Sequence, residues 1–281
     1  MATNDNNPII KICIFTKNEE ADIYGCLKAV KEEFENITVV DSGSSDSTIK
    51  IVEEMGCQVI HHHQKGPFDF AKQRNWFLSS QIGKVDYVLF VDADEFVQEG
   101  CYQILHDVIL SDHHSIDCYE IPLLFRLHGK EIKSLGYPNW HDRLVKPTVI
   151  FDGGVVGDYA KTNSRRRVKD VFFLHDFNSK GFDRFVEKHM RYANYVARQL
   201  CNDDEPSAIF ERKSFNGRIK SFVKNMGMIK PFLRFLYHYF LRLGVFEGKA
   251  GFLLAMHMMM YEYFIEVQRI EILRKRNGLK L

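Results

Sequence analysis

The stretch Tyr87-Val88-Leu89-Phe90-Val91-Asp92-Ala93-Asp94-Glu95 decides the fold of this chain. Its first five residues are apolar or aromatic, which is typical of a strand buried on both faces of a parallel sheet. Ligands in open α/β sheets bind outside the carboxyl ends of the strands, where this run places three carboxylates. Side chains alternate along an extended chain, so Asp92 and Asp94 would point to one side. They predict a site for a hard cation, Mg²⁺ or Mn²⁺, although a solvated acidic turn is the plain alternative.

The segments before this strand alternate between strand patterns and helix patterns. Strands are predicted at Ile9–Phe15, Ile37–Val40 and Gln58–His61, and helices at Ala21–Phe34, Thr48–Met55 and Asp69–Ser80. This alternation predicts βαβ units with right-handed crossovers, and hence an α/β fold with a mainly parallel sheet flanked by helices. The first strand is followed by neither a Gly-x-Gly-x-x-Gly fingerprint nor a Walker A loop, which argues against a Rossmann dehydrogenase.

The composition is that of an ordinary globular protein. The chain has 281 residues, is 45% hydrophobic and carries a formal charge of +1, which argues against general nucleic-acid binding. Six scattered cysteines suggest small buried side chains in a reducing compartment. The polar N-terminus lacks the pattern of a secretion signal, and no uncharged apolar run reaches the ~18 residues of a membrane span. We therefore expect a cytoplasmic protein.

The C-terminal part has a helical and strongly basic pattern. We expect a catalytic domain over residues 1–205 and a helical extension over 206–281, after a helix at Phe182–Leu200. Between Pro206 and Lys249 nine Lys or Arg residues face two Glu residues, a net charge of +7, with aromatic residues interleaved. This pattern indicates a patch that binds the anionic inner face of the membrane, or a core-facing helix with a solvated basic side.

Four segments resemble motifs of family 2 glycosyltransferases with the GT-A fold, in the expected order and spacing. They are Phe15–Glu20, Val39–Thr48, Lys72–Asn75 and Leu89–Glu95. Later segments resemble the subgroup that adds glucose to the lipopolysaccharide inner core: Gly129-Lys130, Tyr137-Pro138 with Arg143-Leu144, and Phe235–Phe252. The resemblance covers nearly the whole chain and implies a GT-A fold, a mixed and mainly parallel sheet with a helical C-terminal extension.

The resemblance also implies a nucleotide-diphospho-sugar donor, UDP-glucose, at the carboxyl edge of the sheet. By matching position, Asp41 would contact the base or ribose and Arg74 would lie near the donor. Asp92 would bind ribose and metal, and Asp94 would bind the metal and take part in catalysis. The loop residues Thr16, Asn18 and Glu19 would line the same site. Without the resemblance, Asp41 could simply be a turn residue at the start of a helix. Arg74 could simply be a solvated residue on a helix.

An inverting transfer needs a carboxylate that takes the proton from the acceptor hydroxyl. The subgroup has a His-Glu pair after a Phe-x-Gly-like segment, and here Phe151–Asp158 places Asp158 at the Glu position and Gly157 at the His position. Asp158 is therefore the expected base, with Asp142 and Glu95 as competitors.

Histidine and aromatic residues add weaker signals. His175, after a strand predicted at Val171–Leu174, is either a structural histidine or a ligand of the metal or diphosphate. Residues His61–His63 are expected to form a loop, since neighbouring side chains on a strand point oppositely. Tyr137–Arg143 is expected as a polar-aromatic loop on the acceptor side, where Trp140 is either stacked on sugar or buried.

The resulting hypothesis is an inverting, metal-dependent hexosyltransferase that uses a nucleotide sugar and a surface-glycan or glycolipid acceptor. A sugar nucleotidyltransferase is the rival enzyme class. It would need a Gly-rich basic loop that binds a triphosphate at the position of Thr16–Glu19, and this sequence does not have one there. A catalytically inactive interaction protein with the GT-A fold is the second alternative, because Gly157 replaces the subgroup's His.

Overall fold

The central apolar run forms strand β4 (Tyr87–Asp92), whose residues 87 to 91 are all buried. It lies between β1 (Ile10–Thr16), which is parallel to it, and β8 (Asn139–Val145), which is antiparallel. These strands belong to a ten-stranded sheet with the order β3-β2-β1-β4-β8-β6-β12-β5, and β7 and β11 also pair with β6. The expected mixed α/β architecture is confirmed.

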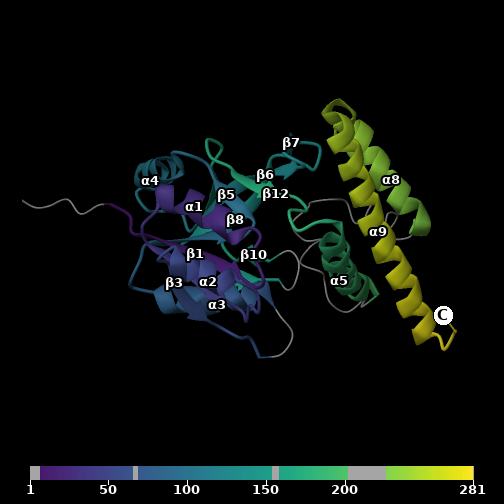
Figure 1. Ribbon diagram of the computed structural model, residues 1–281, viewed down its shortest axis with the longest axis horizontal. Helices are drawn as coiled ribbons and strands as arrows, with labels where there is room; N and C mark the ends of the chain where they lie inside the picture. The colour runs from purple at the N-terminus through teal and green to yellow at the C-terminus, as the bar shows by residue number, and fades with distance from the viewer. Residues whose placement is uncertain (1–6, 66–68, 154–157, 202–225, 281) are drawn as a thin grey trace, which may run out of the picture. The chain divides into compact units, whose positions relative to one another are not determined.

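The computed structural model describes residues 7–65, 69–153, 158–201 and 226–280, and the chain forms two units (Figure 1). The first unit, which contains most of the sheet, comprises the described residues of 1–124, 138–154 and 158–179. The second comprises those of 125–137 and 180–281. The predicted boundary at residue 205 lies outside the described residues and stays a prediction.

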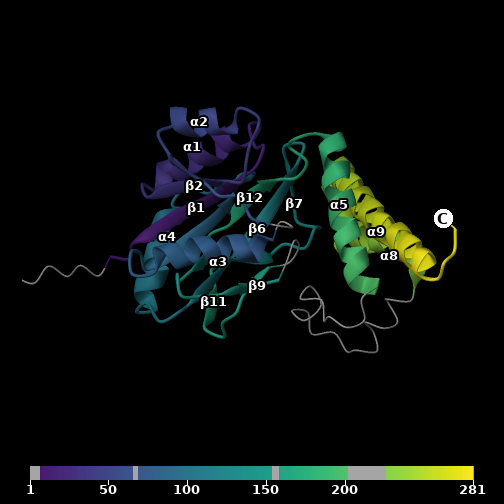
Figure 2. The same cartoon turned by 90° about the horizontal axis from the view of Figure 1, so that it is seen from below.

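The amino-terminal half of the sheet is parallel. Its remaining elements are β2 (Ile37–Asp41), β3 (Gln58–His61), α1 (Ile23–Glu33), α2 (Thr48–Glu54) and α3 (Phe70–Gln81). Because the strand order is 3-2-1-4, right-handed crossovers put α1 and α2 on one face and α3 on the other. Figure 2 shows this arrangement. The predicted elements agree with these bounds within two residues at each end.

The other half of the sheet is largely antiparallel. Its elements are β5 (Glu95–Val97), α4 (Cys101–Ser111), β6 (Cys118–Leu127), β7 (Lys130–Ile132), β11 (Arg165–Arg167) and β12 (Phe173–Asp176), with β9 (Phe151–Asp152) and β10 (Tyr159–Ala160) as a separate pair. Strands β6 and β7 form a hairpin across His128 and Gly129, which both have positive φ.

The loop expected at Tyr137–Arg143 was wrong, because β8 already begins at Asn139 and pairs with β6. The polar residues that suggested a loop are not solvated. Asp142 and Arg143 are both buried in ion pairs, so the polarity of this run comes from buried charge pairs.

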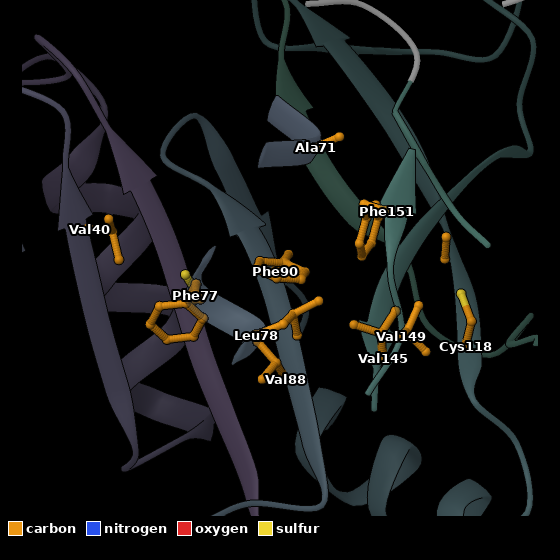
Figure 3. Packing of buried hydrophobic residues seen from close by; sticks show 12 residues of the cluster. Val40, Ala71, Phe77, Leu78, Val88, Phe90, Cys118, Val145, Val149 and Phe151 are labelled. Atoms are coloured by element: carbon orange, nitrogen blue, oxygen red, sulfur yellow. The ribbon is translucent and has the colours of Figure 1, made fainter. Parts of the chain in front are cut away.

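A hydrophobic cluster attaches α3 to the sheet (Figure 3). Phe77 and Leu78 of α3 pack with Val88 and Phe90 of β4, and the rings of Phe77 and Phe90 lie 6.5 Å apart. Phe151 meets Phe90 edge-to-face at 5.8 Å. These contacts bring α3 and β9 next to the carboxyl end of β4.

The second unit is mainly helical. Its elements are α5 (Phe182–Cys201), η1 (Gly227–Ile229), α8 (Lys230–Leu236), η2 (Tyr237–Leu241), η3 (Gly244–Glu247) and α9 (Gly248–Arg276). Helices α5 and α8 both pack along α9 (Figure 1). Ring contacts join Phe185 to His257 at 4.5 Å and Phe235 to Phe252 at 5.8 Å. Within the described part of the chain, no helix combines the length and hydrophobicity needed to cross a bilayer.

Two helical glycines give a matched test of this packing. A methyl group at Gly251 in α9 would overlap the backbone carbonyl oxygen of Gly244, whereas one at Gly25 in α1 would meet the Phe96 ring at 2.7 Å. Backbone cannot move aside, but a half-buried ring can turn. Gly251→Ala should lower the free energy of unfolding by about 1–3 kcal/mol, despite the better helix propensity of Ala. Gly25→Ala should change it by less than about 1 kcal/mol. Urea unfolding followed by circular dichroism measures both, and equal stabilities would contradict this account of α9.

Candidate active site

The carboxyl ends of β1, β2 and β4 meet at one edge of the sheet. In the strand register Thr16 lies beside Asp41, and Phe15 lies beside Asp92. The Thr16 hydroxyl donates a 3.3 Å hydrogen bond to a carboxylate oxygen of Asp41. The structure thus brings Thr16, Asp41 and Asp92 together, and what they bind stays a prediction.

Asp41 organises the turn that follows β2. Its carboxylate accepts hydrogen bonds from the backbone N–H of Gly43 at 2.8 Å, and from the N–H and hydroxyl of Ser44 at 3.0 and 2.5 Å. Burial alone would raise the pKa of Asp41, but the bonds from Ser44 and Gly43 outweigh it and hold the pKa below its ordinary value. Asp41 is therefore ionised and rigidly placed, and both of its oxygens are already in use.

The predicted loop residues Asn18 and Glu19 connect the first loop to the second. The backbone N–H of Asn18 donates to the Ser44 hydroxyl at 2.9 Å, and the Asn18 amide oxygen accepts from the N–H of Ser45 at 2.8 Å. The N–H of Glu19 donates to the hydroxyl of Thr48 at 2.8 Å. Asn18 adopts a positive φ of 58°, which this interlocking stabilises. These residues therefore shape the edge of the sheet.

Arg143 on β8 lies between two of the three carboxylates of the central stretch. One guanidinium nitrogen, Nη2, donates to Asp92 at 3.0 Å and also to Glu95. Glu95 is completely buried, and its second oxygen accepts from the backbone N–H of Asp92 at 3.1 Å. The side chain of Asp92 keeps 41% of its surface exposed. Asp92 therefore faces the edge of the sheet, while Glu95 is structural.

The pKa values of Asp92 and Glu95 shift in opposite directions. The crowded surroundings alone would raise the pKa of Asp92, but the guanidinium of Arg143, with help from Arg74, holds it well below its ordinary value. Burial raises the pKa of Glu95, and Arg143 offsets only part of this effect. Asp92 is thus ionised at neutral pH, which is the state that a cation ligand needs.

Asp94 lies beside His175. Its carboxylate oxygen Oδ1 is 3.4 Å from Nδ1 of the ring, and both side chains are less than one-fifth exposed. His175 lies within β12, where it pairs with Glu95 in the antiparallel register, so it does not follow the strand as expected. The predicted metal-site residues Asp92, Asp94 and His175 all come to this edge. Nevertheless, over the ranges that the structure describes, no three His, Cys, Asp or Glu side chains are grouped as a preformed metal cage.

Arg74 of α3 is buried and faces inward. Its guanidinium carbon lies 4.5 Å from the centre of the Phe90 ring and 5.2 Å from that of Phe151, and Nε donates to Asp158 at 2.6 Å. A solvated helix position is thereby excluded, since Arg74 is 6% exposed. Its Nη1 is buried with no hydrogen-bond partner among the described residues, which is an unsatisfied donor that calls for an explanation.

Asp158 is brought to Arg74 by a short pair of strands. Asn75, the next residue of α3, holds β9 through two bonds to the backbone of Phe151, at 2.7 and 2.8 Å. Asp158 directly precedes β10, which pairs with β9. The predicted base and the predicted donor-binding arginine thus form one ion pair, which the sequence did not indicate.

The two competing candidates for the base are structural. Asp142 is buried, accepts from the backbone N–H of Ala160 at 2.7 Å and pairs with Arg165 at 3.0 Å. Glu95 is held by Arg143 as described above. Both carboxylates are thus buried and paired with arginine, and which residue is the base stays a prediction.

Sequence reasoning missed two residues of the site, His141 and Gln73. His141 lies on β8 and is close enough to Arg143, Asp92 and Arg74 to interact with their charges. Burial, with Arg143 nearby, lowers the pKa of His141 to about 3, so the ring is neutral at pH 7. Its Nε2, like Oε1 of Gln73, is buried with no hydrogen-bond partner among the described residues. The sequence gives no simple signal for His141, because a β-bulge at Arg143 interrupts the alternation of side chains along β8.

The remaining aromatic and histidine signals have structural roles. His61 ends β3, His62 stacks on Trp76 with ring centres 3.6 Å apart, and His63 lies against Gly43. Trp140 is half-buried, and the guanidinium of Arg167 lies 5.2 Å from its ring centre. The expected loop is confirmed for His62 and His63, whereas His61 still belongs to β3.

Relatives in other organisms share parts of this chain. An uncharacterized glycosyltransferase of Rickettsia bellii is 31% identical over 261 residues, which cover 81% of this chain and 84% of that protein. SunS, a prophage-derived glycosyltransferase of Bacillus subtilis, is 29% identical over 140 residues, which are 44% of this chain but only 33% of SunS. Among solved structures, S. aureus TarS residues 1–349 matches 96% of this chain and 92% of that chain, at 16% identity and a TM-score of 0.45.

The family model for Glycosyl transferase family 2 matches residues 11–182, which include every strand of the large sheet. The matched range contains the carboxylates at its edge, the Arg74–Asp158 pair and His175. The chain belongs to glycosyl transferase family 2.

Proposed function

We propose that this chain is an inverting, metal-dependent glycosyltransferase that moves glucose from UDP-glucose to a lipopolysaccharide core or another surface glycan. The observation that carries the proposal is the placement of Asp92 and Asp94 at the open edge of the sheet, with Asp92 held ionised by Arg143. Membership of family 2 supports the reaction class. The likeness of Tyr137-Pro138 and the later segments to inner-core glucosyltransferases supports the choice of sugar and acceptor.

The donor would lie across the ends of β1, β2 and β4. The turn around Asp41 is hydrogen-bonded to Thr16 and Asn18, and it would form a rigid polar surface against which the base and ribose bind. The unsatisfied N–H of Arg74 would supply a charged donor for an oxygen of the nucleotide sugar. Because these groups are held before the ligand arrives, little ordering is needed on binding.

The residues at the edge fit a divalent cation. Asp92 and Asp94 would hold the ion, with His175 orienting Asp94 or joining it as a ligand. Since the described residues offer no third side chain as a preformed ligand set, diphosphate oxygens and water would complete the coordination. A bound cation would neutralise the diphosphate as it leaves.

Asp158 is the proposed base. The acceptor hydroxyl would attack the anomeric carbon on the face opposite the diphosphate, and its proton would pass to a carboxylate oxygen. Arg74 orients Asp158 through one oxygen, Oδ2, and the other oxygen is the proposed proton acceptor.

The acceptor is proposed to be a glycan or glycolipid at the anionic inner face of the membrane. The +7 charge of Pro206–Lys249 supports peripheral association with such a surface, because each cation near it is attracted by the anionic lipids. Five of those cations lie outside the described residues.

The two rival functions make different predictions in the same assay. A nucleotidyltransferase would need a Gly-rich basic loop after β1 to bind a triphosphate. In this chain the loop after β1 contains no Gly at Thr16–Glu19, and Asn18 and Glu19 bond it to the next loop. An inactive interaction protein stays an alternative because Gly157, outside the described residues, replaces His.

Incubation with a panel of nucleotide sugars, with nucleoside diphosphate release as the readout, tests the proposed function. UDP release from UDP-glucose supports it. Pyrophosphate release from UTP and a sugar phosphate would favour a nucleotidyltransferase, and no turnover of any donor would favour the inactive protein.

The metal proposal is tested by Asp94→Asn, which keeps the size of the side chain and removes its charge. We expect donor turnover to fall by about 10²-fold or more, and EDTA to abolish turnover until Mg²⁺ or Mn²⁺ is restored. Asp107→Asn is the control, because this exposed carboxylate of α4 lies outside the site. Turnover that persists unchanged in EDTA, or in Asp94→Asn, would rule out the metal site.

The base proposal is tested by Asp158→Asn. Transfer should fall by roughly 10²–10⁴-fold, because no carboxylate takes the proton. Calorimetric titration of UDP-glucose should show unchanged or tighter binding, since the variant releases Arg74 from its ion pair. Arg74→Gln should do the reverse and weaken donor binding. If donor binding collapses in Asp158→Asn, then Asp158 belongs to the donor site and the base lies elsewhere.

A further inference from the structure

In the segment from Ile229 to Phe246, polar side chains are buried and large apolar side chains are exposed, the reverse of the usual distribution. Lys230 and His238 are buried, at 8% and 4% exposed, whereas Leu241 and Phe246 are 76% and 80% exposed. Eight large apolar side chains, here called the outer apolar face, are all at least 40% exposed: Ile229, Phe232, Leu233, Leu236, Phe240, Leu241, Leu243 and Phe246. In a protein surrounded by water, so large a group of exposed apolar side chains indicates an interaction surface.

The spacing of the first five of these residues places them on one side of the helix. Positions 229, 232, 233, 236 and 240 follow the i, i+3, i+4, i+7, i+11 pattern of an amphipathic face along α8 and η2. The opposite side packs on α9, where Phe235 and Tyr239 both meet Phe252 edge-to-face (Figure 1). These five side chains therefore lie on the side turned away from α9, and the exposed Leu241, Leu243 and Phe246 follow them in the chain.

Buried polar contacts fix this orientation. Lys230 donates to Glu266 of α9 at 2.5 Å, and Glu266 also pairs with Arg269 at 3.2 Å. Nδ1 of His238 lies 3.0 Å from the carbonyl oxygen of Ser134. Rolling α8 to bury its apolar residues would leave these polar groups without partners in the interior, which is strongly unfavourable.

The turn at the end of this segment is equally well held. The carboxylate of Glu247 accepts from the backbone N–H groups of Lys133 and Ser134, at 2.6 and 3.0 Å, and from the Ser134 hydroxyl. Leu243 adopts a left-handed φ of 62°, an unusual conformation for this residue that the anchored turn maintains. The exposed side chains Leu241, Leu243 and Phe246 thus stand on a rigid support.

The charges on the segment itself are mostly positive, although Glu262 of α9 is close enough to Arg234 to interact with it. Between Met226 and Ala250 Glu247 is the only carboxylate in the sequence, and it is bonded to Ser134. Arg234 and Lys249 are exposed, and Arg242 is half-buried. A symmetric contact between two copies would bring these cations together, which argues against a second copy as the occupant. Anionic lipid headgroups match them.

We propose that the outer apolar face docks on an anionic lipid surface, with Phe240, Leu241, Leu243 and Phe246 entering the boundary between headgroups and acyl chains. Arg234, Arg242 and Lys249 lie at the level of the lipid phosphates. Such a helix lies in the plane of the membrane and does not cross it. The inference rests on the proposed function only in that a lipid-linked acceptor would be met at this surface.

The test is sedimentation of the full chain with two kinds of vesicle, phosphatidylcholine alone and phosphatidylcholine with phosphatidylglycerol. The wild type should bind the anionic vesicles and dissociate at high salt, because screening removes the headgroup attraction. Leu241→Ser combined with Phe246→Ser should weaken binding by about tenfold or more, since two large apolar side chains no longer leave water. Leu279→Ser is the matched control, an exposed leucine 52% accessible beyond the far end of α9.

Donor turnover in solution separates this inference from the proposed function. The double variant should keep wild-type UDP release and an unchanged unfolding transition, because both side chains are on the surface. Equal binding of the wild type to both vesicles, or undiminished binding by the double variant, would overturn the lipid surface. A dimer in light scattering that dissociates in the double variant would identify a second copy as the occupant instead.

Discussion

The buried guanidinium of Arg143 is the interaction on which the candidate site depends. It is 2% exposed and bridges two carboxylates that are only three residues apart, Asp92 at the end of β4 and Glu95 at the start of β5. A buried charge left without its partner is destabilising by about 3–5 kcal/mol. The acidic turn is therefore stable only when β8 lies beside β4. One antiparallel strand pairing thus decides both the architecture of the sheet and the charge at its edge.

The acidic side chains of the sheet unit divide into two groups through their partners. Glu95 and Asp142 are buried against Arg143 and Arg165, and they hold strands together. Asp92 and Asp94 keep exposed surface at the edge, where a cation and a diphosphate would meet them. Asp158 stands between these groups, since its ion pair with Arg74 orients it while part of its side chain remains accessible. Burial and pairing thus distinguish carboxylates that look alike in the sequence.

In the helical unit too, a buried ion pair determines which side chains are exposed. The Lys230–Glu266 pair is buried on the inner side of α8, and it turns the apolar residues of that helix outward. In the sheet unit buried ion pairs hold carboxylates at the edge of the sheet, whereas here they hold apolar side chains at the surface. The cations that remain exposed then match an anionic surface.

Much of the fold followed from the sequence because its signals are local. The apolar run of β4, the alternating periods of α1 to α3 and the turn residues after β2 depend on neighbours a few positions away. Because parallel strands end at a common edge, Thr16, Asp41 and Asp92 could be placed together from strand order alone. The outcome for β8 was different, since its polar residues resemble a loop until their ion partners on other elements are known. Three features were decided by the tertiary structure alone. Arg143 bridges Asp92 and Glu95, and Arg74 pairs with Asp158, which is 84 positions further along the chain. Helix α8 turns its apolar side outward. The physical reason is that burial and charge pairing depend on distance in space, and residues far apart in sequence carry no mark of the partners that folding brings to them.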